Sequence, residues 1–281
     1  MINKKLPYFL KRYLKEKPVF LSLIRAKEAK LFQKYVPLKG PVLDVGCGDG
    51  FFAKIALFGK SEVGSLTDVK ASAGKWKSDG TNKKLIDVGL DVKDSRVEEA
   101  RKMDIYKNIV IYDGEKIPFK NNTFNTVISN CVLEHIIKLD MTSKEVYRVL
   151  KPGGLFIATV ATKNWEEYLF GNFIFGDIYK KWMRKKQVHF NLLTNKQWKI
   201  TFKKQGFKIV QEIGYLDKKA VRWIDLLHYL SISSLITYKL FGKWVLWKDK
   251  LFLFPLRFLS NLISPNIDPR KSGNIFFAIT K

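Results

Sequence analysis

A short apolar run that opens into a glycine-rich turn constrains this chain more than any other feature. Residues 41–45 read Pro-Val-Leu-Asp-Val, and Gly-Cys-Gly-Asp-Gly follows at 46–50. The apolar residues that come next, from Phe51 to Ala56, repeat with helical spacing. A buried strand, a glycine turn and a helix in this order are typical of nucleotide-binding α/β folds, because glycine lets the backbone approach a ligand without a Cβ clash.

Further strand-like runs alternate with helical patterns along the chain. The strand-like runs cover residues 85–91, 108–112, 126–130, 155–160, 207–215 and 274–281, and helical patterns include 18–35, 95–103 and 143–150. This alternation predicts a doubly wound α/β fold, with a mostly parallel sheet and helices on both faces. Ligands bind such sheets beyond the carboxyl ends of the strands, where Asp91, Asp113 and residues 130–135 are expected.

Four motifs resemble those of the class I S-adenosylmethionine-dependent methyltransferases, in their ubiquinone-methyltransferase-like, type 11 branch. They are Val-Leu-Asp-Val-Gly-Cys-Gly-Asp-Gly at 42–50, Asp-Gly-Glu-Lys-Ile-Pro-Phe at 113–119, Val-Ile-Ser-Asn-Cys-Val-Leu-Glu-His at 127–135, and Arg-Val-Leu-Lys-Pro-Gly-Gly at 148–154. Their order and spacing match over about residues 41–160, slightly under half of the chain. The resemblance implies a seven-stranded sheet in the order 3-2-1-4-5-7-6 with strand 7 antiparallel, and an enzyme of class EC 2.1.1.

The resemblance also implies S-adenosyl-L-methionine as the cofactor and assigns its site. The cofactor-binding residues in this assignment are Asp44, Gly46, Cys47, Gly48, Gly50, Asp91, Asp113, Gly114, Asn130 and Cys131. The glycine loop and Asp44 would face the methionine part, and an acidic residue that ends strand 2 would accept both ribose hydroxyls. Asp113 would accept from the adenine amino group, and Asn130 and Cys131 would lie beside the sulfonium.

The acidic residue that ends strand 2 has two candidates. Val-Gly-Leu-Asp at 88–91 and the run that ends at Asp68 both resemble the expected strand ending. Asp91 is favoured because a clear helical pattern and another strand follow it, whereas Asp68 leads into a stretch rich in Lys, Gly, Ser and Asn that is typical of a surface loop. Residues 59–84 are then an insertion.

Two histidines are candidate catalytic residues. His135 follows strand 4 near the expected methyl position, and an imidazole can take a proton from an acceptor hydroxyl near neutral pH. A structural role at the start of a helix is an equal alternative for His135. His189 lies in the segment after strand 5 and is the second candidate, although proximity and alignment can suffice without a base. The spacing of His and Cys residues predicts no metal site.

Basic charge is concentrated outside the central block. Residues 41–162 carry a net charge of +2, whereas 1–40, 163–205 and 206–281 carry +9, +7 and +7 of the total of +25. We therefore expect N-terminal basic helices at 1–40, a methyltransferase domain at 41–215 plus 273–281, and a basic, aromatic helical insertion at 216–272. Trp and Tyr beside Lys and Arg in 223–264, and a similar pattern at 6–14, suit an anionic membrane surface, and a helical cap is the alternative.

The predicted function is methyl transfer to an O or N atom of a small-molecule, lipid or lipid-linked glycan acceptor. The high basic charge keeps an RNA methyltransferase as an alternative, although no base-methylation motif or appended RNA-binding module is found. A non-catalytic cofactor-binding scaffold is the other alternative. Two cysteines and no apolar run of about 18 uncharged residues predict a cytoplasmic protein, with peripheral association at the inner face of the membrane as a variant of that prediction.

Overall fold

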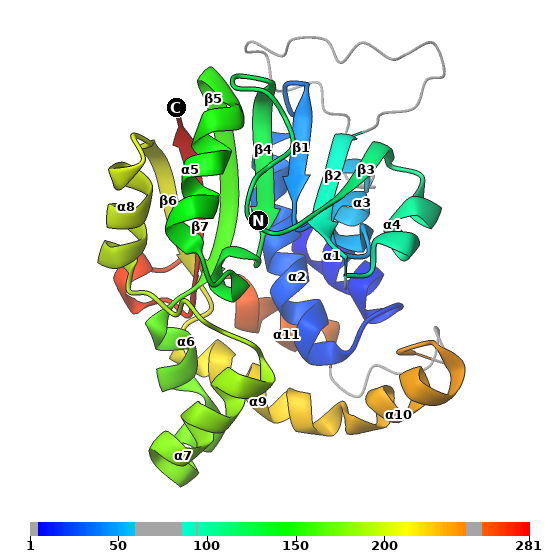
Figure 1. Ribbon diagram of the computed structural model, residues 1–281. Helices are drawn as coiled ribbons and strands as arrows, with labels where there is room; N and C mark the ends of the chain where they lie inside the picture. The colour runs from blue at the N-terminus through cyan, green and yellow to red at the C-terminus, as the bar shows by residue number, and fades with distance from the viewer. Residues whose placement is uncertain (1–4, 60–85, 94, 246–254) are drawn as a thin grey trace.

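A seven-stranded sheet forms the centre of the computed structural model, which describes residues 5–59, 86–93, 95–245 and 255–281 (Figure 1). The strands are β1 (Val42–Val45), β2 (Ile86–Val92), β3 (Tyr106–Tyr112), β4 (Phe124–Asn130), β5 (Leu150–Ala161), β6 (Lys208–Tyr215) and β7 (Asn274–Thr280). Their order is β3-β2-β1-β4-β5-β7-β6, and β7 is antiparallel to both of its neighbours while the other pairs are parallel. The predicted fold class and strand order are confirmed.

Helices cover both faces of the sheet and one of its ends. They are α1 (Lys5–Leu14), α2 (Val19–Phe32), α3 (Phe51–Phe58), α4 (Val97–Met103), α5 (Leu139–Val149), α6 (Lys163–Tyr168), α7 (Phe170–Lys186), α8 (Asn195–Lys204), α9 (Lys218–Leu230), α10 (Ile232–Phe241) and α11 (Leu256–Ile263). Short 3-10 turns occur at Gln33–Tyr35, Leu133–His135 and Pro269–Lys271.

The alternation of side chains along the strands builds two apolar layers. On β7, Phe277 belongs to the layer that packs against α5 and α8, whereas its neighbour Phe276 belongs to the layer against α1, α2, α3, α9 and α11. Both side chains are fully buried, as expected for a strand that is covered on both faces. The second layer joins side chains from Leu6 to Ala278, and the division of the chain into three parts stays a prediction.

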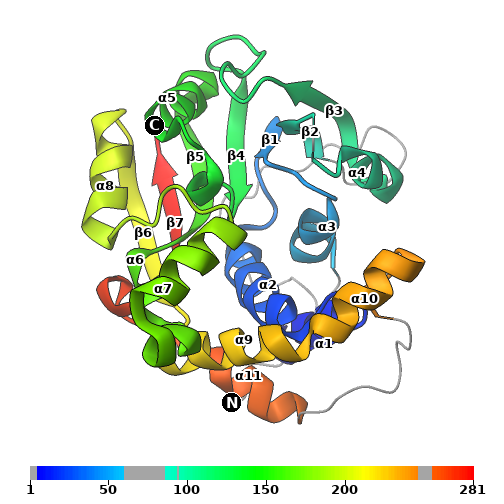
Figure 2. The same ribbon diagram turned by 60° about the horizontal axis from the view of Figure 1, so that its bottom comes forward.

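The carboxyl ends of the parallel strands meet at one edge of the sheet. Figure 1 shows these ends pointing down toward α2, with α6, α7, α9 and α10 below them. Figure 2, which brings this end forward, shows α7, α9 and α10 together across it. The candidate ligand-binding residues therefore lie between the sheet and a layer of helices from distant parts of the chain.

The apolar faces of α1, α9 and α11, which were predicted to contact a membrane, are buried, so that part of the prediction is wrong, whereas α10 of the same predicted range has exposed apolar side chains. In the N-terminal segment, Leu6, Phe9, Leu10 and Tyr13 are at most 2% exposed. The apolar faces of α9 and α11 are likewise buried, through Ala220, Val221, Ile224 and Leu227 and through Leu259, Leu262 and Ile263. These helices cover the sheet and each other because their apolar faces find an intramolecular partner. Residues 246–254 of the predicted surface lie outside the described residues.

A buried lysine fixes α2 to the other end of the chain. Lys27 is fully buried, and its Nζ donates to the carbonyl oxygens of Ser264 and Pro265 and to Oδ1 of Asn266 at 2.8–2.9 Å. Three acceptor oxygens satisfy the three donors of an ammonium group, so this contact is specific as well as buried. It holds α2 across the carboxyl edge of the sheet, where α2 lines the cavities described below.

Candidate active site

The glycine turn after β1 adopts backbone conformations that favour glycine. Gly46 and Gly48 have φ angles of 75° and 54°, and a Cβ on Gly46 would come within 2.3 Å of the Val132 side chain. A Cβ on Gly48 would meet nothing within 4 Å, so this position opens onto free space. The amide of Gly48 donates to Oδ2 of Asp91 at 2.7 Å and thus ties the loop to the end of β2.

Asp91 ends the strand that pairs with β1. Asp44 of β1 is opposite Gly89 of β2, which brings the ends of the two strands together. Asp91 is half-buried, and its Oδ1 accepts the amide of Val92 at 2.8 Å. Asp68, the alternative candidate, lies outside the described residues. The structure therefore places Asp91 beside the glycine turn.

A cavity of about 200 Å³, here called the loop cavity, lies between the glycine turn and the N-terminal helices. Its lining includes Asp44, Gly46, Cys47, Gly48 and Asp49 from the turn, Tyr13, Lys17, Leu21 and Arg25 from the N-terminal segment, and Arg96 and Asn130. Sequence reasoning missed the N-terminal contribution, because Tyr13 and Leu21 look like residues that simply pack. Lys17 and Arg25 interrupt this apolar pattern, and these two cations were the signal that could have indicated a contribution to the site.

The two carboxyl groups of the loop cavity, Asp44 and Asp49, have pKa shifts of opposite direction. Burial raises the pKa of Asp44 to about 7, with a smaller opposing effect from the Tyr106 hydroxyl, which donates to Oδ2 at 2.6 Å. Burial also opposes ionisation of Asp49, yet Lys17 at 2.5 Å and Arg96 at 3.3 Å lower its pKa overall. Asp49 is therefore a structural carboxylate, whereas Asp44 changes charge near neutral pH.

A second cavity, here called the Asp113 cavity, has a volume of about 430 Å³ and lies beyond the ends of β2 and β3. It is lined by Gly46, Asp91, Val92, Tyr112, Asp113, Gly114, Glu115, Val132, His135, Ile136, Ile137, Lys138 and Phe190. Asp113 is exposed, and its Oδ1 accepts the amides of Glu115 and Lys116 at 2.8 and 3.2 Å, which lowers the pKa of the carboxyl. Gly46 lines this cavity and the loop cavity, so the two adjoin.

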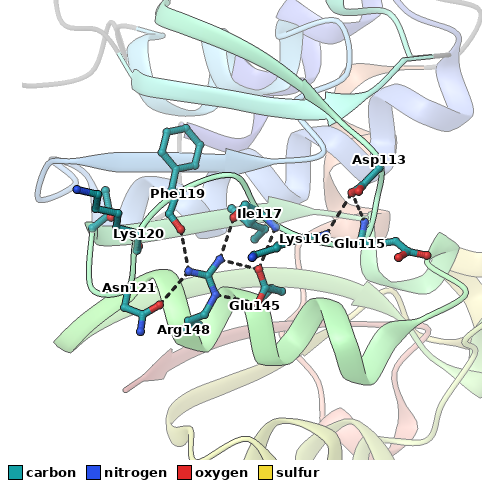
Figure 3. A network of polar contacts seen from close by, with 10 residues as sticks. Asp113, Glu115, Lys116, Ile117, Phe119, Lys120, Asn121, Glu145 and Arg148 are labelled. Carbon is teal, nitrogen blue, oxygen red and sulfur yellow. Dashed lines mark hydrogen bonds and ion pairs between the residues drawn. The ribbon is translucent and has the colours of Figure 1, made fainter.

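Arg148 fixes the segment that follows Asp113. Figure 3 shows its guanidinium among Ile117, Phe119 and Asn121, with Glu145 alongside. It donates to the carbonyl oxygens of Ile117 and Phe119 at 2.8 and 2.7 Å and binds Glu145 with two nitrogens at 2.6 and 2.8 Å. A planar guanidinium can satisfy all these acceptors at once. The arginine of the fourth sequence motif thus shapes the turn at Asp113 without lining the cavity.

A buried carboxylate on α2 organises the end of β4. Glu28 accepts from Asn130 Nδ2 at 3.1 Å, from Cys131 Sγ at 3.0 Å and from the Tyr215 hydroxyl at 2.9 Å, and it pairs with Arg25 at 2.7 Å. The sequence offered one signal, since Glu28 interrupts the apolar helical face that includes Ile24 and Leu31. Buried charges require such partners, and here the partners are site residues.

A third cavity, here called the inner cavity, has a volume of about 240 Å³ and lies among α2, α6 and α9. Its lining is largely apolar and aromatic, with polar groups from several elements: Phe20, Leu21, Ile24, Arg25, Cys131, Glu134, His135, Ala161, Trp165, Leu169, Gln187, His189, Ile224, Asp225, His228 and Asn274. Most of these residues escaped sequence reasoning, because they come from segments spread over the whole chain and no local pattern links them.

Several polar atoms in the inner cavity lack a protein partner. Among the described residues, Glu134 Oε2, His189 Nδ1 and Asn274 Oδ1 are buried without a hydrogen bond. Burial raises the pKa of Glu134 and lowers that of His189 to about 3, so His189 is neutral at physiological pH. Unsatisfied buried groups are costly, and a ligand that bonds with them would remove this cost.

The two candidate catalytic histidines lie next to each other. The ring centroids of His135 and His189 are 4.9 Å apart. Nδ1 of His135 is 3.0 Å from the carbonyl oxygen of Val188. A carbonyl oxygen only accepts, so Nδ1 carries a hydrogen, and in the neutral ring Nε2 is then the nitrogen with the lone pair. The geometry therefore leaves His135 with a proton-accepting nitrogen at the point where the inner and Asp113 cavities meet.

Neither metal ligation nor membrane crossing is evident in the described parts of the chain. No group of three or more His, Cys, Asp or Glu residues there could hold a metal ion. No helix in the same ranges is both long and apolar enough to cross a bilayer.

Comparison with known proteins finds a family match for the central part of the chain. Residues 43–158 match a family described as a methyltransferase domain. The chain carries a class I S-adenosylmethionine-dependent methyltransferase domain. The four motifs that suggested this family all lie within or next to the matched residues, and S-adenosyl-L-methionine is the cofactor of the family.

Named relatives match about half of this chain or less. The chain is 28% identical over 141 residues to demethylmenaquinone methyltransferase of Symbiobacterium thermophilum, an alignment that covers 48% of each protein. It is 35% identical over 117 residues to sterol 4-C-methyltransferase strm-1 of Caenorhabditis elegans, covering 41% of this chain and 29% of that protein. The chain thus spans half or less of the length of these relatives.

A solved structure resembles the chain over nearly its full length. The SAM-dependent methyltransferase of Thermotoga maritima, described as a possible histamine N-methyltransferase, superposes with a TM-score of 0.55 and 15% identity. The match covers 96% of this chain and 93% of that one. At this identity the likeness concerns the fold alone.

The residues around the loop cavity of the methyltransferase domain fit S-adenosylmethionine. The amino-acid end of this cofactor carries an ammonium and a carboxylate, and the cavity offers Asp44 together with the cations Lys17, Arg25 and Arg96. The Tyr13 hydroxyl is buried in the same lining and has no hydrogen-bond partner among the described residues. A polar ligand could form a hydrogen bond with this unsatisfied hydroxyl and lie against the open backbone of the glycine turn.

Proposed function

We propose that the chain transfers a methyl group from S-adenosyl-L-methionine to an O or N atom of a small-molecule, lipid or lipid-linked glycan acceptor held in the inner cavity. One observation carries this proposal: the inner cavity shares Leu21 and Arg25 with the loop cavity and His135 with the Asp113 cavity. A cofactor that occupies the loop and Asp113 cavities would then have its reactive centre next to the inner cavity.

In this proposal the cofactor contacts follow the lining of the two outer cavities. Asp44 faces the cofactor ammonium, the backbone of Gly46, Cys47, Gly48 and Gly50 lies against its methionine part, and Asp91 accepts the ribose hydroxyls. Asp113 has its Oδ2 directed to the adenine amino group, since Oδ1 is engaged by backbone amides, and Gly114 lies under the ring. Asn130 and Cys131 separate the loop cavity, which Asn130 lines, from the inner cavity, which Cys131 lines.

The protein contributes positioning and proton transfer to the proposed reaction. The bound cofactor supplies a sulfonium methyl group that is already activated toward nucleophiles. Apolar walls such as Ile24, Trp165 and Ile224 exclude water and hold the acceptor near this group, which reduces the entropic barrier. Nε2 of His135 accepts the proton of an acceptor hydroxyl, and the neutral His189 orients that hydroxyl by a hydrogen bond.

Labelled cofactor tests the proposal directly. The purified chain is incubated with methyl-labelled S-adenosylmethionine and fractions of a cell extract, and label is expected in a small-molecule or lipid fraction. Label in RNA would instead favour the alternative function, and cofactor binding without any labelled product would favour a scaffold.

His135→Gln then tests the proposed base once an acceptor is identified. We expect kcat to fall by roughly 100-fold or more. The matched variant His189→Gln should lower kcat less. An unchanged kcat in His135→Gln would refute the base and leave methyl transfer by proximity.

A further inference from the structure

Several apolar side chains are exposed on α7 and α10, beyond the carboxyl edge of the sheet. On α7, Phe173, Ile174, Phe175, Ile178 and Trp182 are between 46% and 81% exposed. On α10, Ile236, Leu240 and Phe241 are between 54% and 70% exposed. Both helices lie at the same end of the molecule, with α9 between them (Figures 1 and 2). Exposed apolar side chains that are concentrated at one end of a molecule mark a candidate interaction surface.

Positive charge accompanies these apolar residues. Residues 170–186 and 232–245 contain seven Lys and Arg residues, and their single acidic residue, Asp177, pairs with Lys180 at 2.8 Å. After the kink at Gly176, Ile178, Trp182 and Lys185 follow at helical spacing. The ammonium of Lys186 lies 6.0 Å from the centre of the Trp182 ring. An apolar surface with interspersed cations and tryptophan suits the interface of an anionic bilayer.

We propose that the surface formed by α7 and α10 docks on an anionic lipid bilayer. A second copy of this chain would bring two surfaces of the same strong positive charge together, which is repulsive. Nucleic acid is matched by the charge and by the exposed rings of Phe173, Phe175 and Trp182, but the exposed aliphatic side chains of Ile174, Ile178, Ile236 and Leu240 are matched only by hydrocarbon. Hydrocarbon and anionic head groups together complement what this surface presents.

Docking would bring the inner cavity to the lipid surface. Leu169 immediately precedes α7 and Gln187 immediately follows it, and both line the inner cavity. A bilayer in contact with α7 would thus lie next to the cavity rim, so that an acceptor dissolved in the membrane could enter. This consequence rests on the proposed function, whereas docking itself does not.

Vesicle co-sedimentation with a pair of matched variants tests the proposal. The full chain is mixed with vesicles of phosphatidylcholine containing no phosphatidylglycerol or about 30% of it, at about 0.1 M salt, where surface charges are partly screened. We expect sedimentation with the anionic vesicles and little with the neutral ones. Ile174→Glu combined with Ile178→Glu should reduce the bound fraction by roughly tenfold or more, because it removes hydrocarbon and adds repulsion.

The control variant makes the same chemical change on another surface. Ile200→Glu on α8 combined with Val210→Glu on the edge strand β6 alters two apolar residues that are 54% and 64% exposed, close to the 53% and 81% of the α7 pair. This control should bind within about twofold of the unchanged chain, since added charge alone has a small effect. Calorimetry with S-adenosylmethionine should show unchanged cofactor affinity in both variants, which separates docking from the site.

Three results would overturn the proposal. The unchanged chain could stay in the supernatant with anionic vesicles. The two variant pairs could lose binding equally, which would show that net charge alone decides. A dimer in light scattering that only the α7 pair dissociates, without vesicle binding, would assign the surface to a second copy.

Discussion

The cofactor side and the acceptor side of the site are built in different ways. The loop and Asp113 cavities take much of their lining from strand ends and the turns that follow them, and backbone conformation shapes them at Gly46, Gly48 and Gly114. The inner cavity takes its lining from segments between Phe20 and Asn274, and side-chain packing shapes it. Substitutions can therefore change the lining of the acceptor site residue by residue, while the cofactor site, which is built from backbone and motif residues, stays the same.

The largest effect is expected from a substitution that fills the cofactor side of the site and leaves the acceptor side unchanged. Gly48→Arg places a long side chain where a Cβ has free space in front of it, so cofactor affinity should fall by roughly 100-fold or more in calorimetry. Gly153→Arg is the control, because Gly153 also has a positive φ and free space around its Cβ but lies outside the cavities described here. Both variants share the backbone strain of about 1 kcal/mol, and only the first should lose the cofactor. Equal loss in both would mean that strain, not occupancy, is responsible.

The pH dependence of cofactor affinity should also come from the cofactor side of the site, through Asp44. The pKa of Asp44 is about 7, so at lower pH this carboxyl is neutral and no longer attracts the cofactor ammonium. Affinity should therefore rise with pH by up to about tenfold per unit below 7 and level off above it. Titration calorimetry at several pH values measures this slope, and Asp44→Asn should flatten it. A slope that persists in Asp44→Asn would belong to the cofactor or to another group.

A smaller effect on stability and on cofactor affinity is expected from a substitution in the N-terminal helices, which line the cofactor side of the site. Tyr13→Phe removes a buried hydroxyl that has no partner among the described residues, so urea unfolding of the cofactor-free chain should show equal or higher stability, by about 1 kcal/mol. Cofactor affinity should fall by about threefold to tenfold. Tyr215→Phe should have the opposite effect on stability, because its hydroxyl donates to Glu28 at 2.9 Å. Lower stability in Tyr13→Phe would mean that this hydroxyl has a structural partner.

Sequence reasoning reached the fold and the strand ends because both depend on local patterns. The glycine turn, the apolar strands and the choice of Asp91 over Asp68 each required only a few adjacent residues. The N-terminal wall of the site did not emerge, since Tyr13, Arg25 and Glu28 acquire their roles by contact with residues up to about 190 positions away, as Glu28 does with Tyr215. The roles of the individual site residues stay predictions.

Amphipathic helices show why the predicted membrane surface was largely wrong. α7, α9 and α11 all combine apolar residues with Lys or Arg, and the sequence alone ranks none of them as exposed. Ile224 and Leu259 are buried because α9 and α11 pack against α2 and against each other, whereas Ile178 is 81% exposed. Periodicity identifies an apolar face, and only the tertiary arrangement decides what covers it.

The position of β7 within the sheet has a consequence for synthesis of the chain. Among the strands that the structure describes, β6 pairs with β7 alone, and β7 also pairs with β5, so β7 links β6 to the rest of the sheet. A ribosome makes residues 274–280 after every other strand. Until they emerge, the edges of β5 and β6 with which β7 later pairs stay open, and open strand edges favour aggregation.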